Sequence, residues 1–190
     1  MSASPENPGR RAWEQRLLEE RARALAAPRT ALGEEARNAE RVLVCAVGDA
    51  LFGLDMRRVL RVMPFRHPAR LPSANAALLG LIARSGVYHR IFDLGVLLSG
   101  GAARDGGYFL LLRTSVAGLR VDQALNIAAV VPLKAEEAPH GAASYPATRG
   151  YARPLQDGLF EGRLISLLDL DKLLADAAPS AHGGHRSVDL

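Results

Sequence analysis

Short apolar segments separated by turn residues dominate the chain from Arg41 onward. The segment Val42–Val47 is rich in valine, Gly48 and Asp49 follow as a turn, and Leu51–Leu54 returns, which together predict a β-hairpin. Such segments recur along the chain and do not alternate with long helices. The pattern therefore favours small antiparallel barrels over a parallel sheet of the nucleotide-binding kind. Further strands are expected at Val59–Met63, Val87–Phe92, Tyr108–Arg113, Val116–Val121, Ile127–Leu133 and Leu164–Leu168.

Proline, glycine and aspartate mark the connections between these strands. Three prolines lie within Pro64–Asn75, so this segment is expected to be an irregular loop. A single helical turn is expected at Asp93–Leu98, and Asp169 can cap a short helix over Leu170–Leu174. The glycines between positions 100 and 107 predict a flexible turn or a linker between two halves of the fold.

The first 40 residues are polar, charged and rich in alanine, and they predict a helical extension. A helix is expected at Ala12–Ala26, ended by Pro28. At about four turns such a helix is marginal alone in water, so its apolar stripe should pack on something, either the protein's own barrel or a partner. The stripe consists of Trp13, Leu17, Leu18 and Leu25, with Ala24 beside them.

Composition narrows the class of protein. Hydrophobic residues make up 48% of the chain and charged residues 23%, which is ordinary for a folded domain. The single cysteine, Cys45, excludes an internal disulfide and a cysteine-cluster zinc site, and it fits a reducing cytoplasm. Met1–Arg11 has no apolar core of a secretory signal, and no apolar run reaches the length of a membrane span. The net charge is +4, but the arginines form no stripe with interleaved aromatics, so nucleic-acid binding is not expected.

A search for catalytic or metal-binding chemistry finds no complete site. The chain has no glycine-rich phosphate loop, no His-Glu-x-x-His helix and no Gly-x-Ser-x-Gly elbow. Asp169 and Asp171 are better explained by helix capping than by acid–base catalysis. His182 and His185 flank two glycines in the tail, where a solvated segment is favoured over a weak metal site. We therefore predict no catalytic residue, no metal and no cofactor.

Five stretches, taken in order, resemble the CheW-like domain, an adaptor fold of bacterial chemotaxis systems. Gly80–Leu94 is similar to the family's G-x-x-N-L-R-G-x-x-x-P-x-x-D-L segment, and Ala117–Val130 to its V-G-x-x-V-D-x-V element. Each stretch is unspecific alone, whereas five in the right order are much more specific. The other three are Val42–Met56, similar to the opening hairpin, Val59–Pro72, similar to the next strand and loop, and Arg163–Leu174, similar to the final strand and helix.

The resemblance implies an all-β fold of two five-stranded SH3-like barrels with a groove between them. It covers residues 41–174, with a helical N-terminal extension over residues 1–40 and a flexible tail over residues 175–190. The first barrel is expected at about 41–98 together with the C-terminal strand and helix, and the second at about 107–160. Asp55, Asp93 and Asp122 each follow a strand-like segment, where a carboxylate can accept backbone N–H bonds in a turn.

The resemblance also implies a function. The family is non-catalytic, has no cofactor, and couples the cytoplasmic tip of a chemoreceptor to the regulatory domain of the histidine kinase CheA. This chain is thus expected to be a cytoplasmic adaptor. Its expected partner-binding positions are Val59, Arg61, Gly80, Arg84, Ser85, Gly86, Gly118 and Ala124.

Five of the matched positions depart from the family pattern. Arg61 stands where the family usually has Glu, and Arg90 where it usually has Pro. Ala83-Arg84-Ser85 stand where the family usually has Asn-Leu-Arg, and the Arg at the Ser85 position commonly takes part in receptor binding. A charge reversal at a polar interface mainly changes partner choice. The alternatives are an adaptor with divergent partners and an inhibitor or decoy that binds the kinase but not receptors. The arginines at positions 57, 58, 61, 66 and 70 form either a solvated face or a surface for an acidic partner.

Overall fold

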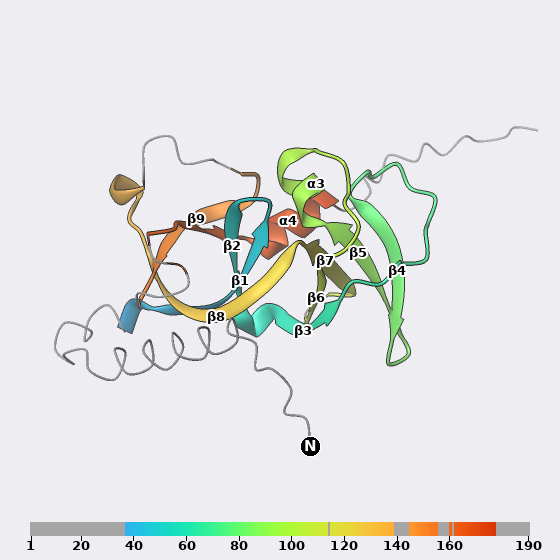
Figure 1. Ribbon diagram of the computed structural model, residues 1–190, viewed down its shortest axis with the longest axis horizontal. Helices are drawn as coiled ribbons and strands as arrows, with labels where there is room; N and C mark the ends of the chain where they lie inside the picture. The colour runs from blue at the N-terminus through green and yellow to red at the C-terminus, as the bar shows by residue number, and fades with distance from the viewer. Residues whose placement is uncertain (1–36, 114, 139–144, 156–159, 161, 178–190) are drawn as a thin grey trace, which may run out of the picture.

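The computed structural model describes residues 37–113, 115–138, 145–155, 160 and 162–177, which form ten strands in two five-stranded sheets with a few short helices (Figure 1). The all-β class predicted from the sequence is confirmed. The predicted helix Ala12–Ala26 and the tail from position 178 onward lie outside the described residues. Within the described part of the chain, no helix is long and apolar enough to cross a membrane.

One of the sheets, which we call the first barrel, closes on itself through hydrogen bonds between all neighbouring strands. Its first two strands are the predicted hairpin, in which Val47 pairs with Ala50 and Gly48 adopts a φ of +56°. Strand β1 is apolar on both faces because Val42 and Val44 pack inside the barrel while Leu43 packs toward the other sheet. In strand order the barrel consists of β1 (Glu40–Val47), β2 (Ala50–Asp55), β10 (Ile165–Leu168), β9 (Thr148–Pro154) and β8 (Gln123–Pro132).

The other sheet, which we call the second sheet, stays open between its edge strands β3 and β4. Strands β5 and β7 run parallel, and the remaining neighbours run antiparallel. The prediction of two five-stranded units is therefore confirmed, and hydrogen bonds close one of them. In strand order the second sheet consists of β3 (Val59–Pro64), β6 (Tyr108–Leu112), β7 (Ala117–Val121), β5 (Val87–Asp93) and β4 (Leu78–Arg84).

The predicted division of the strands between the two units is wrong. Strands β3–β5 do not join the first barrel, and β8 and β9 do not join the second sheet. The chain crosses between the sheets at the short 3-10 helix η1 (Met56–Arg58) and again at Asp122. The glycine-rich segment 100–107 connects α3 to β6 within the second sheet and is not a linker between halves. Turn residues look alike in both roles, so composition could not tell a connection within one sheet from a crossing between sheets.

Each of the two α-helices begins at an aspartate whose carboxylate caps it. Helix α3 (Leu94–Ser99) begins with the Asp93 Oδ1 atom accepting a bond of 3.1 Å from the Val96 amide. Helix α4 (Leu170–Ala177) begins with Asp169 Oδ1 accepting from the amide of Lys172 at 3.1 Å. Both helices and the capping role of Asp169 were predicted, and the structure confirms them. A second 3-10 helix, η2, spans Ala135–Glu137.

One of three buried apolar clusters, which we call the shared core, joins the first barrel, the second sheet and both α-helices. In Figure 1, α3 and α4 lie where the two sheets meet. Cys45 is fully buried in this shared core, as predicted, and burial raises the pKa of its thiol. A shared core predicts that both sheets unfold together. It includes Leu43, Phe52 and Leu54 from the first barrel, Leu110, Leu112 and Leu119 from the second sheet, and Leu94, Leu98, Leu170 and Leu173 from the helices.

A buried guanidinium, that of Arg120 in β7, ties the second crossing to both sheets. Arg120 is 3% exposed, and its Nη1 atom lies 2.6 Å from Asp122 Oδ1 and 3.5 Å from Asp93 Oδ2. Its Nε atom donates to the Gly106 carbonyl at 2.9 Å. Asp122 Oδ2 in turn accepts from the amide of Gly48, in the β1–β2 turn, at 2.7 Å. This set of contacts, the Arg120 cluster, thus links the first barrel, α3 and the glycine-rich segment.

Replacing Arg120 with Met should lower the free energy of unfolding by about 3–5 kcal/mol, because the buried Asp93 carboxylate loses its cation. The matched control is Arg104→Gln. Arg104 also lies near Asp122, at 3.6 Å, but its side chain is 67% exposed, so this change should cost less than about 1 kcal/mol. Urea unfolding of both variants provides the measurement. Equal losses would show that the Arg120 cluster does not stabilise the junction.

Candidate functional site

One end of the second sheet forms a groove lined by residues of β3, β4, β5 and β6 and of the turns that follow β4 and precede β7. The register brings the start of β3, the end of β6 and the starts of β5 and β7 together, since Val59 pairs with Leu112 and Arg90 with Ala117. This end groove has a volume of about 590 Å³. It is lined by Leu60, Arg61, Arg84, Ser85, Val87, His89, Leu111, Leu112, Arg113, Ser115 and Val116.

A tight turn between β4 and β5 places Arg84 and Ser85 on the rim of the end groove. Arg84 pairs with Val87, so Ser85 and Gly86 form a two-residue hairpin loop. Their φ angles are +50° and +77°, and a type I′ turn requires positive values at both positions. Glycine meets this requirement without strain at the second position. The local role of Gly86 is therefore to make the turn that presents its neighbours.

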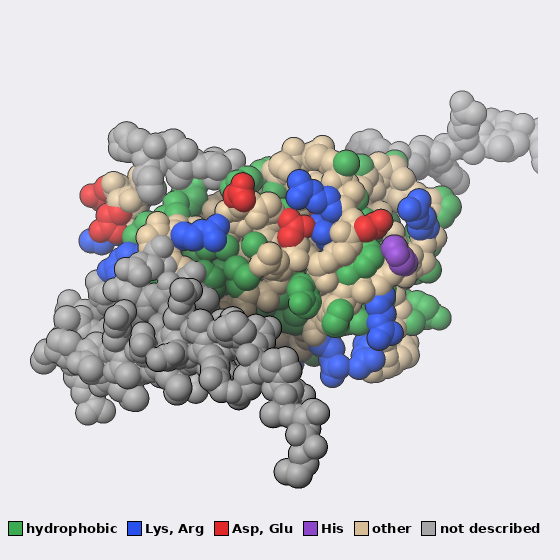
Figure 2. All heavy atoms as spheres, viewed as in Figure 1, with side chains coloured by type: hydrophobic (Ala, Val, Ile, Leu, Met, Phe, Trp, Pro, Cys, Tyr) green, Lys and Arg blue, Asp and Glu red, His purple; other side chains and the backbone are tan. Residues whose placement is uncertain are grey.

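The lining of the end groove is apolar and basic. Leu60, Val87 and Val116 are 48%, 43% and 51% exposed. Arginines lie around them at positions 61, 84 and 113, and no carboxylate is among the described lining residues. Figure 2 shows basic side chains gathered beside apolar ones around the tip of the β4–β5 hairpin, at the lower right. Such a surface suits a partner with apolar and acidic side chains.

Two buried polar atoms on the lining lack hydrogen-bond partners among the described residues: His89 Nδ1 and Ser115 Oγ. His89 is 6% exposed and comes from β5, where it lies two residues after Val87 and so on the same face of the strand. An unsatisfied buried polar atom lowers the free energy of unfolding by about 1–3 kcal/mol. Two such atoms beside one groove are therefore unusual in a folded protein.

The structure brings three of the eight predicted partner-binding residues into the end groove: Arg61, Arg84 and Ser85. Gly86 lies beside them in the turn. The partner-binding role of all eight stays a prediction. The remaining four lie elsewhere: Val59 is buried in the shared core, Gly80 faces the loop after β3, Gly118 packs against Ile91 and Leu111, and Ala124 lies in the first barrel opposite Cys45.

His89, Val87 and Ser115 were not predicted from the sequence to lie at a partner-binding site. Period-two spacing along β5 could have placed Val87 and His89 on one inward face with Ile91. Ser115 carried no such signal, because it lies between strands where no periodicity applies.

Gly80 has a packing role that the sequence did not reveal. Its φ is +143°, and a Cβ atom there would lie 2.2 Å from the carbonyl oxygen of Ala69. This close approach lets Ala69 and Leu81 exchange two backbone hydrogen bonds of 2.8 Å, which cover the outer edge of β4. The loop after β3 is thereby attached to the second sheet.

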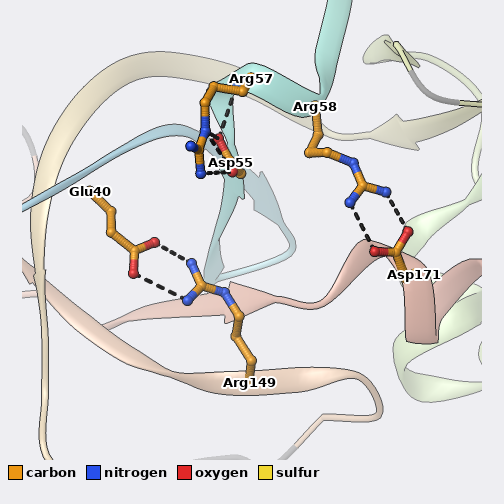
Figure 3. A network of polar contacts seen from close by, with 6 residues as sticks. All are labelled: Glu40, Asp55, Arg57, Arg58, Arg149 and Asp171. Atoms are coloured by element: carbon orange, nitrogen blue, oxygen red, sulfur yellow. Dashed lines mark hydrogen bonds and ion pairs between the residues drawn. The ribbon is translucent and has the colours of Figure 1, made fainter.

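Ion pairs hold the first crossing between the sheets in place (Figure 3). Arg58 of η1 forms a two-bond pair with Asp171 of α4, one bond measuring 2.9 Å. Arg57 binds Asp55, and its hydrogen bonds lower the pKa of that carboxyl. Two of the five arginines expected to form a basic face are thus paired with carboxylates. A third pair joins Glu40 to Arg149 across the first barrel.

The ion pair between Arg58 and Asp171 also changes the pKa of the Asp171 carboxyl. Its hydrogen bond lowers the pKa of Asp171 below the ordinary range of an aspartate side chain. A carboxyl whose pKa is lowered by folding adds stability above its unfolded pKa, and that contribution is lost as the pH falls through the folded pKa. The pair therefore strengthens the contact between η1 and α4 at neutral pH and weakens it in acid.

Comparison with known proteins gives one family and one fold. A family model described as "CheW-like domain" matches residues 41–178. The crystal structure of the scaffolding protein TtCheW from Thermoanaerobacter tengcongensis is similar, with a TM-score of 0.54 and 19% sequence identity over 70% of this chain and 85% of that chain. At this identity the likeness shows a common fold. No curated protein matches the chain.

Replacing Gly80 with Ala should lower the free energy of unfolding by about 1–3 kcal/mol, because the new Cβ must displace the Ala69 carbonyl and φ is unfavourable. Amide hydrogen exchange should be faster at Leu81, whose bond to Ala69 would be lost. Gly86→Ala is the control, since a Cβ there meets nothing within 4 Å and only the turn strain applies. Unchanged exchange at Leu81 in Gly80→Ala would contradict the packing role.

Replacing Arg58 with Gln should raise the pKa of Asp171 into the ordinary range of an aspartate side chain, because the hydrogen bond that lowers it is lost. Carboxyl ¹³C shifts followed by NMR through an acid titration measure it. The matched variant Arg57→Gln should raise the pKa of Asp55 and leave that of Asp171 alone, because Arg58 is the cation that acts on Asp171. An Asp171 pKa that does not respond to Arg58→Gln would refute the pair.

Proposed function

The chain belongs to the family of CheW-like domains, and from this membership and the end groove we propose that it is a non-catalytic adaptor coupling a chemoreceptor to a CheA-type histidine kinase. The observation that carries the proposal is the convergence of Arg61, Arg84 and Ser85 on one groove. The family resemblance expects partner contacts at these three positions, and they come from two separate segments of the second sheet, β3 and the β4–β5 hairpin.

The architecture supports an adaptor in a second way. An adaptor must hold two partners in a fixed relation, and a shared core lets two sheets act as one rigid unit. The end groove offers one surface to a partner. The first barrel, where Ala124 lies, offers another. The kinase regulatory domain and the receptor tip are the two partners, and the protein works beside them in the cytoplasm.

The state of the ionisable groups also supports a binding role. Cys45 is buried and its pKa is raised, which makes its thiol a poor nucleophile. The carboxylates examined for catalysis have structural partners, since Asp169 caps α4 and Asp171 pairs with Arg58. Among the described residues, no group of three or more His, Cys, Asp or Glu side chains could hold a metal ion.

The second candidate is a kinase-binding inhibitor or decoy that does not bind receptors. The observation that favours it is the lining of the end groove by Arg61 and Ser85, where the family usually has Glu and Arg. Reversing the sign of a charge in a groove can abolish the binding of one partner while the contacts that other partners make elsewhere stay intact.

Calorimetric titration of the full chain with the kinase regulatory domain and, separately, with a receptor-tip fragment tests the proposal. Both partners should be the chemosensory proteins encoded beside this one. Binding of both supports the adaptor, and binding of neither refutes the proposal.

The double variant Arg61→Glu, Ser85→Arg separates the two candidates. For an adaptor with divergent partners it should weaken receptor-tip binding at least about tenfold, because the groove charge is rearranged. For a decoy it should create receptor-tip binding that the natural sequence lacks. Arg70→Gln is the charge-matched control, because it changes the net charge by the same −1 as the double variant. Arg70 is exposed on the loop after β3 and does not line the end groove.

A further inference from the structure

We propose that the end groove binds an acidic peptide segment of a partner, with an aliphatic side chain inserted between the arginines and a carboxylate reaching His89 and Ser115. The inference rests on the proposed function, because it names the chemistry that the adaptor's groove recognises. It adds a ligand class and two recognition residues, His89 and Ser115, that the sequence did not indicate.

The end groove carries positive charge that no acidic residue of its described lining balances. Three arginines, at positions 61, 84 and 113, lie on a groove whose described lining has no acidic residue. Among the described residues none of the three forms an ion pair, although Arg113 Nη2 lies 3.4 Å from the Val59 carbonyl. Elsewhere in the described part of the chain, carboxylates pair with Arg57, Arg58, Arg120 and Arg149. Cations that line a concave surface without acids attract an anionic ligand.

The second argument is the pair of unsatisfied polar atoms. His89 is 94% buried, given its exposed fraction of 6%, and its Nδ1 atom has no partner among the described residues. Ser115 Oγ, on the other side of the β5–β7 pairing, is in the same state. A hydroxyl can donate to a carboxylate oxygen, and an imidazole nitrogen that bears a proton can do the same. Because both atoms are almost fully covered, the His89 and Ser115 side chains must turn toward the groove before a ligand carboxylate can satisfy them and also pair with the arginines.

The third argument is the apolar component. Leu60, Val87 and Val116 are about half exposed and line the same groove. Arginines alone would suit any polyanion, nucleic acid included. Three aliphatic side chains between them favour a peptide that carries leucine or a similar residue among its acids. The described lining contains no Phe, Tyr or Trp ring on which a base could stack, and the His89 ring is buried.

Two matched synthetic peptides test the inference on the full chain. One has a pair of leucines between clusters of glutamate, and the other has glutamine at every glutamate position; both carry the same uncharged solubilising tail. Backbone amide shifts followed by NMR give the affinity and the location of binding. The glutamate peptide should bind at least about tenfold more tightly and shift the amides of Arg84, Ser85, His89 and Val116.

Variants of the groove make the test specific. Arg61→Glu should lower the affinity for the glutamate peptide at least about fivefold. Arg70→Glu makes the same change in charge and should leave that affinity within about twofold of the natural sequence. Ser115→Ala should lower the affinity for the glutamate peptide roughly fivefold. It should leave the free protein equally or more stable, because an unsatisfied hydroxyl is removed. A purely structural serine would give the opposite stability result.

The results that overturn the inference are equally concrete. They are equal binding of the two peptides, shifted amides away from the end groove, or equal effects of Arg61→Glu and Arg70→Glu. The peptides replace the natural partners, so this test stands even if neither the kinase domain nor the receptor tip binds. Binding of those two partners by a chain that ignores the acidic peptide would refute the present inference and leave the adaptor intact.

Discussion

The ion pair between Arg120 and Asp122 is the contact on which the two-sheet arrangement depends. Asp122 lies where the chain leaves the second sheet for the first barrel, and its amide also donates to the Ala46 carbonyl at 3.0 Å. Because the same carboxylate holds the β1–β2 turn through Gly48, the crossing fixes how β8 lies along β1. A buried arginine with two carboxylates is costly unless every partner is in place, so the cluster favours one arrangement of the sheets.

The end groove follows from an incomplete closure. The first barrel closes and fills its interior with side chains, whereas β3 and β4 of the second sheet do not pair. The ends of its strands therefore leave the end groove, which has a volume of about 590 Å³. The Ser85–Gly86 turn and the contact of Gly80 with Ala69 hold its walls. A groove built from strand ends of a rigid sheet can present charges in fixed positions, which suits specific recognition.

Local features were predictable from the sequence, and long-range ones were not. The hairpin at 42–54 and the cap at Asp169 depend on neighbouring residues, and both are confirmed. The assignment of strands to sheets failed because pairing of β1 with β8 joins residues more than 70 positions apart. Strand β4 was missed because its sequence, apolar or glycine at nearly every position, has no alternation of apolar and polar residues. Family likeness indicated Arg61, Arg84 and Ser85, but no local pattern indicated Ser115.

Receptor control of kinase activity, reconstituted with and without this chain, tests the adaptor account most directly. The measurement is the transfer of labelled phosphate from ATP to the kinase, in the presence of membranes that contain the receptor. The account predicts that the receptor changes the rate of kinase autophosphorylation only when the chain is added. Equal receptor control without the chain, or a kinase that the chain inhibits whether or not the receptor is present, would contradict it.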